Sequence, residues 1–444
     1  MKKSFLLWNT DACMLGIAQR LEEEGYPTFS YYSTSSEKFA KGAGKGITNV
    51  VDDMYDVLFD FKDRKDDLII IIDGNDRGDE CDYLRSEGWH LIGSSHYTEE
   101  IEHERDEGDA LAQEIGLNLP PSVSFTDFGK AIEYLKKLDD DIKLVFKGDG
   151  LDMAGSSFTY LANTVGEMIK QTNWVKQGAD SGKYKIDKFS YHEVVDGIEV
   201  DFAGWFNGKS FVPAMFVDFE QKRIHGLGAA VGCLGQIETF LDATKEPYFM
   251  EYIAKLQPKL KGDVANEWAI NNIVDEKDGK CYFLEFTPRL GWDSTVGELA
   301  LLKDAGKSIG EYFEMIAFQK PFPKDYFPFG RYSCSVRLYT GSTGHEYECI
   351  KGKPLFWDQK YNDNLWWYGI KQCDEDYEIC GNPVGVAVAC GDTPEEAMLK
   401  VYEIIDPRNN HIVIPDIFYS ETIGEKVSDK IKELKSLGVL NNDK

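Results

Sequence analysis

The sequence predicts a mixed α/β and α+β protein built from two to four domains. About the first 100 residues alternate short apolar runs with stretches of helical spacing, which is typical of a parallel α/β layer. Strand patterns separated by glycine-containing turns dominate from about residue 142 onward. The length of 444 residues fits two to four domains at roughly 100–200 residues each.

The N-terminal segment has the pattern of two strand and helix units. Ser4 to Trp8 is apolar, a polar turn follows at Asn9-Thr10-Asp11, and apolar residues then recur at helical spacing until Gly25-Tyr26-Pro27. A second helical pattern at 54–61 precedes the run Leu68–Ile72, whose unbroken apolarity predicts a central strand buried on both faces. The turn after the first strand contains no G-x-G-x-x-G pattern, which disfavours a nicotinamide dehydrogenase.

Strands and turns dominate the middle of the chain. Ile142–Lys147 predicts a short strand, followed by a loop of small residues. We expect a hairpin at Val195-Asp196-Gly197-Ile198, because an Asp-Gly pair accepts the positive φ values of a type I′ turn. A second hairpin is predicted to join Ala269–Val274 to Tyr282–Phe286.

The C-terminal part follows a stretch rich in proline and aromatic residues, Lys320 to Pro328, which predicts a domain boundary. Beyond it the pattern is rich in strands, and it ends with two helical patterns at Thr393–Ile405 and Glu425–Leu437.

The net charge of −28 restricts the partners that the protein can attract. An acidic surface repels polyanions, which disfavours direct binding to polynucleotides or anionic lipid, so small anions must be held by a few local cations and backbone amides. The longest aliphatic run, Leu68–Ile72, is far shorter than the roughly 20 residues of a membrane span, and the N-terminus lacks the pattern of a signal peptide. The nine cysteines form no CxxC pair. We therefore expect a cytoplasmic protein with reduced thiols and no membrane contact.

Four motifs that could carry chemistry occur in a fixed order. Lys147 ends a predicted strand and is followed by the small-residue loop Gly148–Ser157, whose N–H groups could surround phosphate oxygens. Tyr191–Asp201, a glycine-rich loop at Gly226–Gly235, and Leu284–Gly291 follow. Each motif alone is a weak signal.

In this order the motifs resemble those of the ATP-grasp ligases, and most closely those of the glycinamide ribonucleotide synthetases (phosphoribosylamine-glycine ligases). Residues 145–151 resemble the family's VVKADGL, Lys222-Arg223 with 228–235 resembles its HKR and GPNTGGMG, and 285–289 resembles its EFNxRFG. Near the C-terminus, residues 385–402 resemble GVTA-GDT-EEA-AY and residues 419–424 resemble YRxDIG. The resemblance extends from about residue 102 almost to the end of the chain.

The resemblance implies an ATP-grasp fold in three parts: an N-terminal Rossmann-like (pre-ATP-grasp) domain at 1–101, an ATP-grasp domain at 102–325 with a lid subdomain at about 122–195, and a C-terminal β-rich domain at 326–444. It also implies an ATP-dependent ligase. In such enzymes ATP phosphorylates a carboxylate, and an amine then attacks the acyl phosphate. The implied partners are ATP, an amino acid or other small carboxylate, and an amine; the oligomeric state stays open.

The resemblance also implies roles for individual residues. The residues implied to bind ATP are Arg105, Lys147, Gly155, Ser156, Glu193, Val194, Val195 and Glu199. Among them, Lys147 would pair with the phosphates, 193–195 would read the adenine edge, and Glu199 would bind the ribose. The residues implied to hold Mg²⁺ or Mn²⁺ are Glu285, Thr287 and Asn271, and those implied to act on the transferred phosphate or substrate carboxylate are Arg289, Lys222 and Arg223. Strand alternation places Glu285 and Thr287 on one face, as two oxygen ligands of a hard cation require.

The sequence departs from the family at several positions. The family's GKG lid is Gly155-Ser156-Ser157 here, and the Asn of its EFN is Thr287. The family's GSGGREH is replaced by Leu7–Cys13, and the arginines of its GGRVL and YRxDIG are replaced by Asn382 and Ser420. Each of the last three changes removes a cation that could hold a ribose phosphate, which favours a different amine acceptor.

Three interpretations stay open at this point. The first is a glycinamide ribonucleotide synthetase. The second is a related ligase that couples an amino acid to another amine, such as a nucleotide, a modified base or a metabolite. The third is a nucleotide-binding protein without catalysis, which the residues at 156 and 287 favour.

Overall fold

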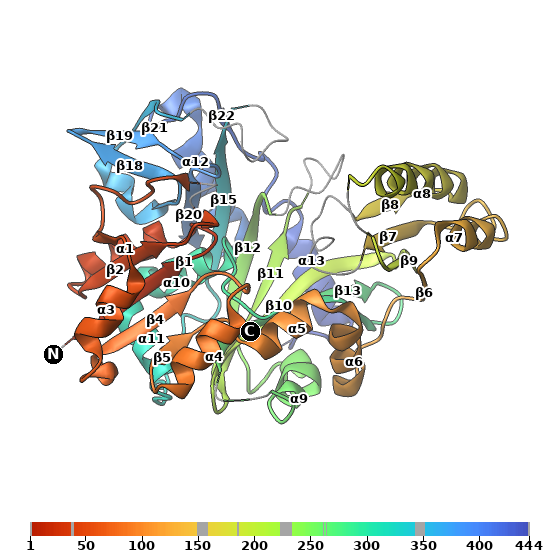
Figure 1. The fold of residues 1–444 in the computed structure, drawn as a ribbon, viewed down its shortest axis with the longest axis horizontal. Coiled ribbons are helices and arrows are strands. Elements are labelled where there is room, and N and C mark those ends of the chain that lie inside the picture. The colour runs from red at the N-terminus through yellow and green to blue at the C-terminus, as the bar shows by residue number, and fades with distance from the viewer. Residues whose placement is uncertain are drawn as a thin grey trace.

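The computed structural model describes residues 2–36, 40–148, 159–183, 186–222, 233–260, 262, 264–341 and 351–442. One sheet of 14 strands runs through the molecule in the order β17-β20-β15-β12-β11-β10-β13-β5-β4-β1-β2-β3, with β14 beside β13 and β22 beside β15 (Figure 1). It therefore crosses all three of the expected domains.

The N-terminal layer contributes the parallel part of this sheet. Its strands are β1 (Ser4–Asn9), β2 (Thr28–Tyr32), β3 (Val50–Val51), β4 (Leu68–Ile72) and β5 (His90–Ile92), and its helices are α1 (Leu15–Glu23), α3 (Met54–Phe61), α4 (Gly78–Ser86) and α5 (His96–His103). All five side chains of β4 are buried, as the unbroken aliphatic run predicts. The carboxyl ends of β1 and β4 lie side by side, because Trp8 is in register with Ile72.

The central part of the sheet is antiparallel. Its strands are β10 (Gly197–Asn207), β11 (Phe211–Glu220), β12 (Gly235–Asp242), β13 (Ala265–Asp275) and β14 (Cys281–Thr287). The predicted hairpin between β13 and β14 is confirmed, with Val274 opposite Cys281. A parallel contact of Ala265 with Ile92 joins this part to the N-terminal layer.

A separate small sheet projects from the body of the molecule, at the right of Figure 1. It contains β6 (Ser122–Phe125), β7 (Leu144–Gly148), β8 (Tyr160–Ala162) and β9 (Phe189–Glu193), with α7 (Phe128–Leu135) and α8 (Val165–Asp180), and it follows α6 (Arg105–Ile115). It has its own core, in which Phe146, Phe189 and Tyr191 are buried. The small sheet is thus attached to the large sheet through short connections.

The hairpin predicted at Val195-Asp196-Gly197-Ile198 is wrong. β9 pairs with β6 and β7 in the small sheet, whereas β10 pairs with β11 and β13 in the large sheet. Glycine is needed at position 197 for a different reason: a Cβ there would lie 2.2 Å from the carbonyl oxygen of Val274 on β13. The Asp-Gly pair therefore marks a link between two sheets rather than a tight turn.

The C-terminal part extends the large sheet with β15 (Tyr332–Thr340), β20 (Gly385–Gly391), β17 (Leu365–Trp367) and β22 (Ile417–Phe418). It also forms a second small sheet from β16 (Pro354–Trp357), β18 (Ile370–Cys373), β19 (Asp376–Ile379) and β21 (Ile412–Val413). Both predicted helices are present, as α12 (Pro394–Ile405) and α13 (Val427–Ser436). The Thr393 side chain caps α12 by accepting the Glu396 N–H at 3.1 Å.

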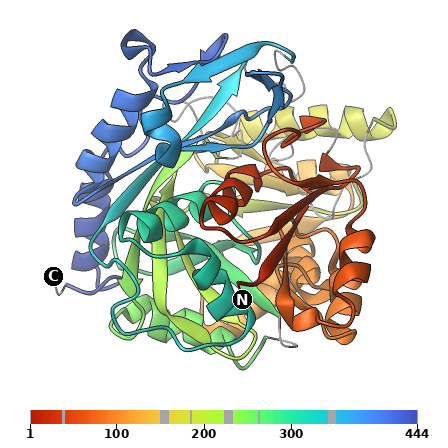
Figure 2. The ribbon, with the colours of Figure 1, turned by 90° about the vertical axis from the view of Figure 1, so that its left-hand side faces the viewer.

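Two helices pack between the N-terminal and C-terminal parts of the sheet. α10 (Ser294–Asp304) is buried along most of its length and contacts β12, β15 and β20, and α11 (Ile309–Ala317) contacts β5 and β10. Figure 2 shows the N-terminal layer, in red and orange, beside the C-terminal strands, in blue. None of the helices in the described part of the chain is both long and apolar enough to cross a bilayer.

Candidate active site

Four cationic side chains from different parts of the chain act electrostatically on the Glu285 carboxylate on β14. Lys147 lies on β7, Arg105 begins α6, Lys222 follows β11, and Arg289 follows β14. Burial would raise the pKa of Glu285, but Lys222, Lys147, Arg105 and Arg289 together lower it below its ordinary value. In a chain with a net charge of −28, these four cations are a local concentration of positive groups of the kind that a polyphosphate requires, although Lys222 and Arg289 are also paired with carboxylates.

The Lys147 ammonium is poorly compensated. Burial and the neighbouring Arg105 lower its pKa to about 8, although Glu285 and Asp109 oppose the shift. A lysine desolvated in this way becomes more stable when an anion binds beside it. The environment of Lys147 therefore fits the phosphate contact that the sequence resemblance implies.

Lys222 and Glu199, which the sequence assigns to different subsites, form an ion pair. The Lys222 Nζ lies 2.9 Å from Glu199 Oε1 and 3.2 Å from Glu220 Oε2. Burial alone would lower the pKa of Lys222, but Glu220 and Glu199 raise it well above its ordinary value. The lysine is thus fully charged and oriented by two carboxylates.

The three predicted metal ligands lie together at the β13–β14 pair. Asn271 is directly opposite Glu285, and Thr287 lies two residues further along the same strand. Asn271 is only 5% exposed, and its Oδ1 has no hydrogen-bond partner among the described residues. An unpaired buried oxygen beside a carboxylate fits a Mg²⁺ site, because Mg²⁺ takes few protein oxygens and completes its shell with phosphates and water. The described residues contain no alternative group of three or more His, Cys, Asp or Glu side chains arranged for a metal.

The segment predicted to read an adenine edge, Glu193 to Val195, connects the two sheets. The N–H of Glu193 donates to the Pro121 carbonyl at 2.9 Å, and the N–H of Val194 donates to the Lys143 carbonyl at 3.2 Å. An adenine edge would therefore have to be read by the N–H of Val195 or by carbonyl oxygens of this segment. Of the other predicted residues, Arg223, Gly155 and Ser156 lie outside the described residues.

Arg289 has a partner that the sequence analysis missed. Its Nε donates to Glu102 Oε1 at 2.9 Å, and Asn75 Nδ2 donates to the other oxygen, Oε2, at 2.8 Å. Burial would lower the pKa of Arg289, but Glu102 and Asp11 raise it above its ordinary value. Glu102 and Arg289 are 187 residues apart in the chain, so no local spacing could have indicated the pair.

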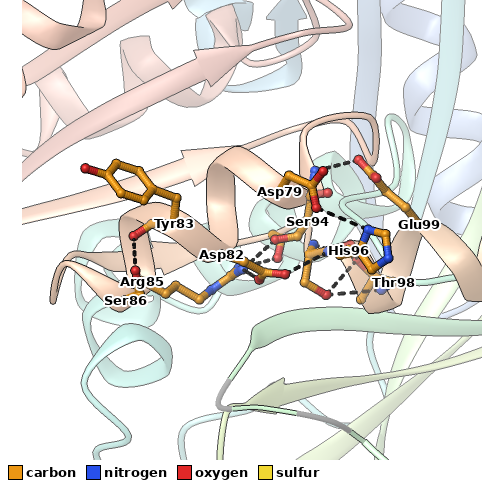
Figure 3. A network of polar contacts seen from close by, with 12 residues as sticks. Asp79, Asp82, Tyr83, Arg85, Ser86, Ser94, His96, Thr98 and Glu99 are labelled. Atoms are coloured by element: carbon orange, nitrogen blue, oxygen red, sulfur yellow. Dashed lines mark hydrogen bonds and ion pairs between the residues drawn. The ribbon is translucent and has the colours of Figure 1, made fainter.

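A polar network fixes the helix that carries Glu102 (Figure 3). The Arg85 guanidinium on α4 donates to the backbone carbonyls of Gly93 and Ser94, both at 2.6 Å. The His96 ring at the start of α5 lies 3.2 Å from Asp79, and the Ser95 hydroxyl caps the helix by accepting the Thr98 N–H at 3.1 Å. The position of Glu102 is therefore set by the N-terminal layer.

The loop between β1 and α1 is organised around a second missed residue, Asp73. Its Oδ1 accepts the N–H of Thr10 at 2.6 Å and of Asp11 at 3.2 Å, and its Oδ2 accepts the N–H of Cys13 at 3.2 Å. The Thr10 hydroxyl also donates to Oδ1, at 3.1 Å. The N–H groups of Thr10, Asp11 and Cys13 are thus occupied by a carboxylate of the same chain.

A small pocket lies beside this loop. It is lined by Asp11, Ala12, Ala40, Trp292, Tyr368, Asn382 and Pro383. Asp11 and Asn382 stand at two of the positions where the sequence lacks a cation of the family. The third, Ser420, is buried elsewhere, where its hydroxyl donates to Gln221 Oε1 at 3.4 Å. The structure therefore brings two of the three departures into one pocket.

A row of polar side chains continues from the predicted metal ligands across the sheet. Asp201 on β10 is opposite Asn271 on one side and opposite Asp218 on the other. Burial raises the pKa of both aspartates well above the ordinary value; repulsion by Asp218 adds to the shift of Asp201, and repulsion by Glu220 and Glu238 adds to the shift of Asp218. Asp201 lies within the motif Tyr191–Asp201 named from the sequence, whereas no sequence motif indicated Asp218.

The elements and their order define the ATP-grasp fold.

No protein-family model matches the sequence, and no curated protein matches it. Among solved structures, the chain is similar to the phosphoribosylamine–glycine ligase of Thermotoga maritima, with a TM-score of 0.70 and 18% identity over 95% of this chain and 100% of that chain. It is also similar to the biotin carboxylase domain of the 2-oxoglutarate carboxylase of Hydrogenobacter thermophilus, solved with MgADP and bicarbonate (TM-score 0.63, 12% identity, 99% of each chain). A third neighbour is the N5-carboxyaminoimidazole ribonucleotide synthetase of Thermotoga maritima, with a TM-score of 0.54 and 13% identity over 95% of this chain and 100% of that chain. Identities this low establish the fold alone.

Proposed function

We propose that the protein is an ATP-dependent carboxylate–amine ligase. The observation that carries the proposal is the convergence of Lys147, Arg105, Lys222 and Arg289 on Glu285, from both sheets, in an otherwise acidic chain. The similar ATP-grasp structures, which are a ligase, a carboxylase and a synthetase, support the same class of chemistry. We also propose the three domains with boundaries near residues 101 and 325, and a lid at about 122–195.

The proposed reaction has two balanced steps. The carboxylate R–COO⁻ takes the γ-phosphoryl group of ATP, which gives R–CO–OPO₃²⁻ and ADP. The neutral amine R′–NH₂ then displaces phosphate, which gives the amide R–CO–NH–R′ and HPO₄²⁻. Such a reaction needs charge neutralisation and positioning rather than a protein nucleophile.

The residues of this chain would divide these tasks. Lys147 and Arg105 would bind the ATP phosphates from the side of the small sheet, and Arg289 would bind the transferred phosphoryl group with its planar fork. Glu285, Thr287 and Asn271 would hold Mg²⁺ or Mn²⁺, which when bound neutralises charge on the phosphate oxygens. Lys222 and Arg223 would orient the substrate carboxylate, and the loop that contains Gly155 and Ser156 would bind the ATP phosphates.

The amine substrate separates two versions of the proposal. A phosphoribosylamine-glycine ligase, as in purine biosynthesis, needs donors for a ribose phosphate. The occupation of the β1–α1 loop amides by Asp73 favours a ligase that uses another amine. A nucleotide-binding protein without catalysis is the other candidate, because a Thr stands at position 287 where the family has Asn.

An ADP-release assay tests the proposal. We expect ADP and phosphate to form only when ATP, Mg²⁺, one amino acid of a panel and one amine of a panel are all present. Glu285→Gln should abolish this release, whereas Glu80→Gln, an exposed charge loss on α4, should leave it unchanged. ATP binding without release under any combination would support the non-catalytic candidate and overturn the ligase.

A further inference from the structure

The pocket beside the β1–α1 loop lies where three parts of the chain meet. Asp11 and Ala12 come from the N-terminal layer, Trp292 comes just before α10, and Tyr368 and Asn382 come from the C-terminal part. We propose that this pocket binds an unphosphorylated, cationic amine whose ammonium group is held by the Asp11 carboxylate. The claim that this pocket holds the amine that accepts the acyl group rests on the proposed ligase function. The claim that the pocket binds an amine does not.

The first argument is that a phosphate has no donors left at this loop. The N–H groups of Thr10, Asp11 and Cys13 all point to the Asp73 carboxylate, with distances of 2.6, 3.2 and 3.2 Å. A phosphate brought here would have to displace a buried carboxylate that is itself negative. Burying an anion without donors is costly, so the loop disfavours a phosphorylated amine.

The second argument is the charge of the pocket wall. Of the seven described residues that line the pocket, Asp11 alone is charged. Arg289, which acts electrostatically on Asp11, is itself paired with Glu102 at 2.9 Å, and Arg337 is paired with the buried Asp293 at 2.8 Å. Arg289 therefore offsets the charge of Asp11 only in part, and Asp73 and Asp76 add negative charge around it, which complements an ammonium group.

The third argument is the shape of the Asp11 environment. One carboxylate oxygen, Oδ2, accepts the Trp292 indole N–H at 3.3 Å, which orients the group. The Trp292 and Tyr368 rings lie edge to face with centroids 6.4 Å apart. The Arg337 guanidinium already lies over the Trp292 ring, 5.1 Å from its centroid, so the two rings offer apolar contact for the body of the amine, and Asp11 provides the contact for the ammonium group.

The pocket also connects to the phosphate side of the site. Arg289, which lies among the cations around Glu285, also interacts electrostatically with Asp11. Burial and Asp73 raise the pKa of Asp11 to about 7, while Arg289 opposes the shift. Near neutral pH, Asp11 can therefore take one proton from R′–NH₃⁺ and leave the R′–NH₂ that attacks an acyl phosphate.

Calorimetric titration of the full chain without ATP tests the binding claim. The probes are 1,4-diaminobutane, ethanolamine and O-phosphoethanolamine. We expect the first two to bind and O-phosphoethanolamine to bind at least tenfold more weakly than ethanolamine. Asp11→Asn should weaken 1,4-diaminobutane by about tenfold or more, because a charge-assisted hydrogen bond is lost. Glu80→Gln, the control, should bind it as the parent does.

Trp292→Phe keeps the ring and removes the N–H that orients Asp11, so it provides a second test if Asp11→Asn does not fold. It should weaken the diamine less than Asp11→Asn and leave melting cooperative. Equal or tighter binding of O-phosphoethanolamine than of ethanolamine, or unchanged diamine binding in both variants, would overturn the proposal.

The ADP-release assay separates this proposal from the ligase function. Diamine binding that depends on Asp11, without ADP release for any carboxylate, would support the pocket and refute the ligase. ADP release that requires a phosphorylated amine would support the ligase and refute the pocket assignment.

Discussion

The Arg289 guanidinium and the Glu102 carboxylate join the end of β14 to α5 through a 2.9 Å ion pair. Arg289 is 29% exposed and Glu102 is 15% exposed, so the pair is partly screened from water. It fixes a cation of the candidate site against the N-terminal layer, on the side where Asp11 lies. The relationship makes Glu102 a positioning residue that acts through Arg289.

Replacement of Glu102 by Gln should therefore impair catalysis more than ATP binding. The variant keeps the size of the side chain but removes the charge that orients Arg289. We expect a roughly tenfold or greater loss of kcat with a smaller change in KM for ATP, and a loss of about 1–3 kcal/mol in the free energy of unfolding. ADP-release kinetics and urea unfolding measure the two effects.

The matched control is Asp429→Asn, which breaks an ion pair with Lys432 whose two side chains are each 76% exposed. A surface pair of this kind contributes about 0–1 kcal/mol, so both readouts should stay near the parent values. Equal kinetic effects of the two variants would contradict the positioning role of Glu102.

The stability of the protein should depend on pH through Asp11. Its pKa is raised to about 7, so the folded state keeps a proton that the unfolded state loses near pH 4. The contribution of protonated Asp11 is therefore complete below about pH 4 and is lost as the pH rises to about 7. Asp73 and Asp76 strengthen this shift, and Arg289 opposes it.

Asp11→Asn removes this contribution. The free energy of unfolding of the variant minus that of the parent should therefore rise between pH 5 and pH 7 and stay constant above pH 7. The expected rise is on the order of 1–2 kcal/mol, because one pKa unit corresponds to about 1.4 kcal/mol. Urea unfolding at several pH values measures it. A difference between the two proteins that is independent of pH would show that Asp11 titrates normally.

Much of the fold could be predicted from local patterns. The aliphatic run at Leu68–Ile72 gave a correct buried strand, and the β13–β14 hairpin and α12 followed from spacing and capping. The link at Gly197 could not be predicted in this way. Its glycine is required by the approach of Val274, and that contact exists only once β13 is in place.

The site was predictable only where a motif lies within one strand or loop. Glu285 and Thr287 share a strand face, and Asn271, which was also named from the sequence, lies opposite Glu285. Glu102 and Asp73 carry no local signal, because each acts on a segment far away in the sequence. Long-range polar contacts of this kind depend on the assembled sheet and not on periodicity.

Gly197→Ala tests the contact between the link and β13. The added Cβ would lie 2.2 Å from the Val274 carbonyl oxygen, so the start of β10 must move away from β13. We expect a loss of about 1–3 kcal/mol in the free energy of unfolding, as for other overpacked positions. Gly166→Ala near the start of α8, where the nearest atom is 3.3 Å away on the Asp140 side chain, should change stability much less. Similar losses in both variants would contradict the steric argument.

Two neighbouring asparagines on β13 allow a sharp test of the proposed metal site. Asn271 is opposite Glu285, whereas Asn272 points to the other face, where its Nδ2 donates to the Tyr248 hydroxyl at 2.8 Å. The Oδ1 atoms of both residues have no hydrogen-bond partner among the described residues. Asn271→Ala should raise the Mg²⁺ concentration needed for half-maximal ADP release by about tenfold, with little loss of stability, because no hydrogen bond to its Oδ1 is broken. Asn272→Ala should instead lower the free energy of unfolding by about 1–3 kcal/mol and leave the Mg²⁺ dependence unchanged, because a buried hydrogen bond is lost. Mg²⁺ titration and urea unfolding of both variants give the comparison. A Mg²⁺ dependence that responds to Asn272 but not to Asn271 would place the metal on the opposite face of the sheet from Glu285.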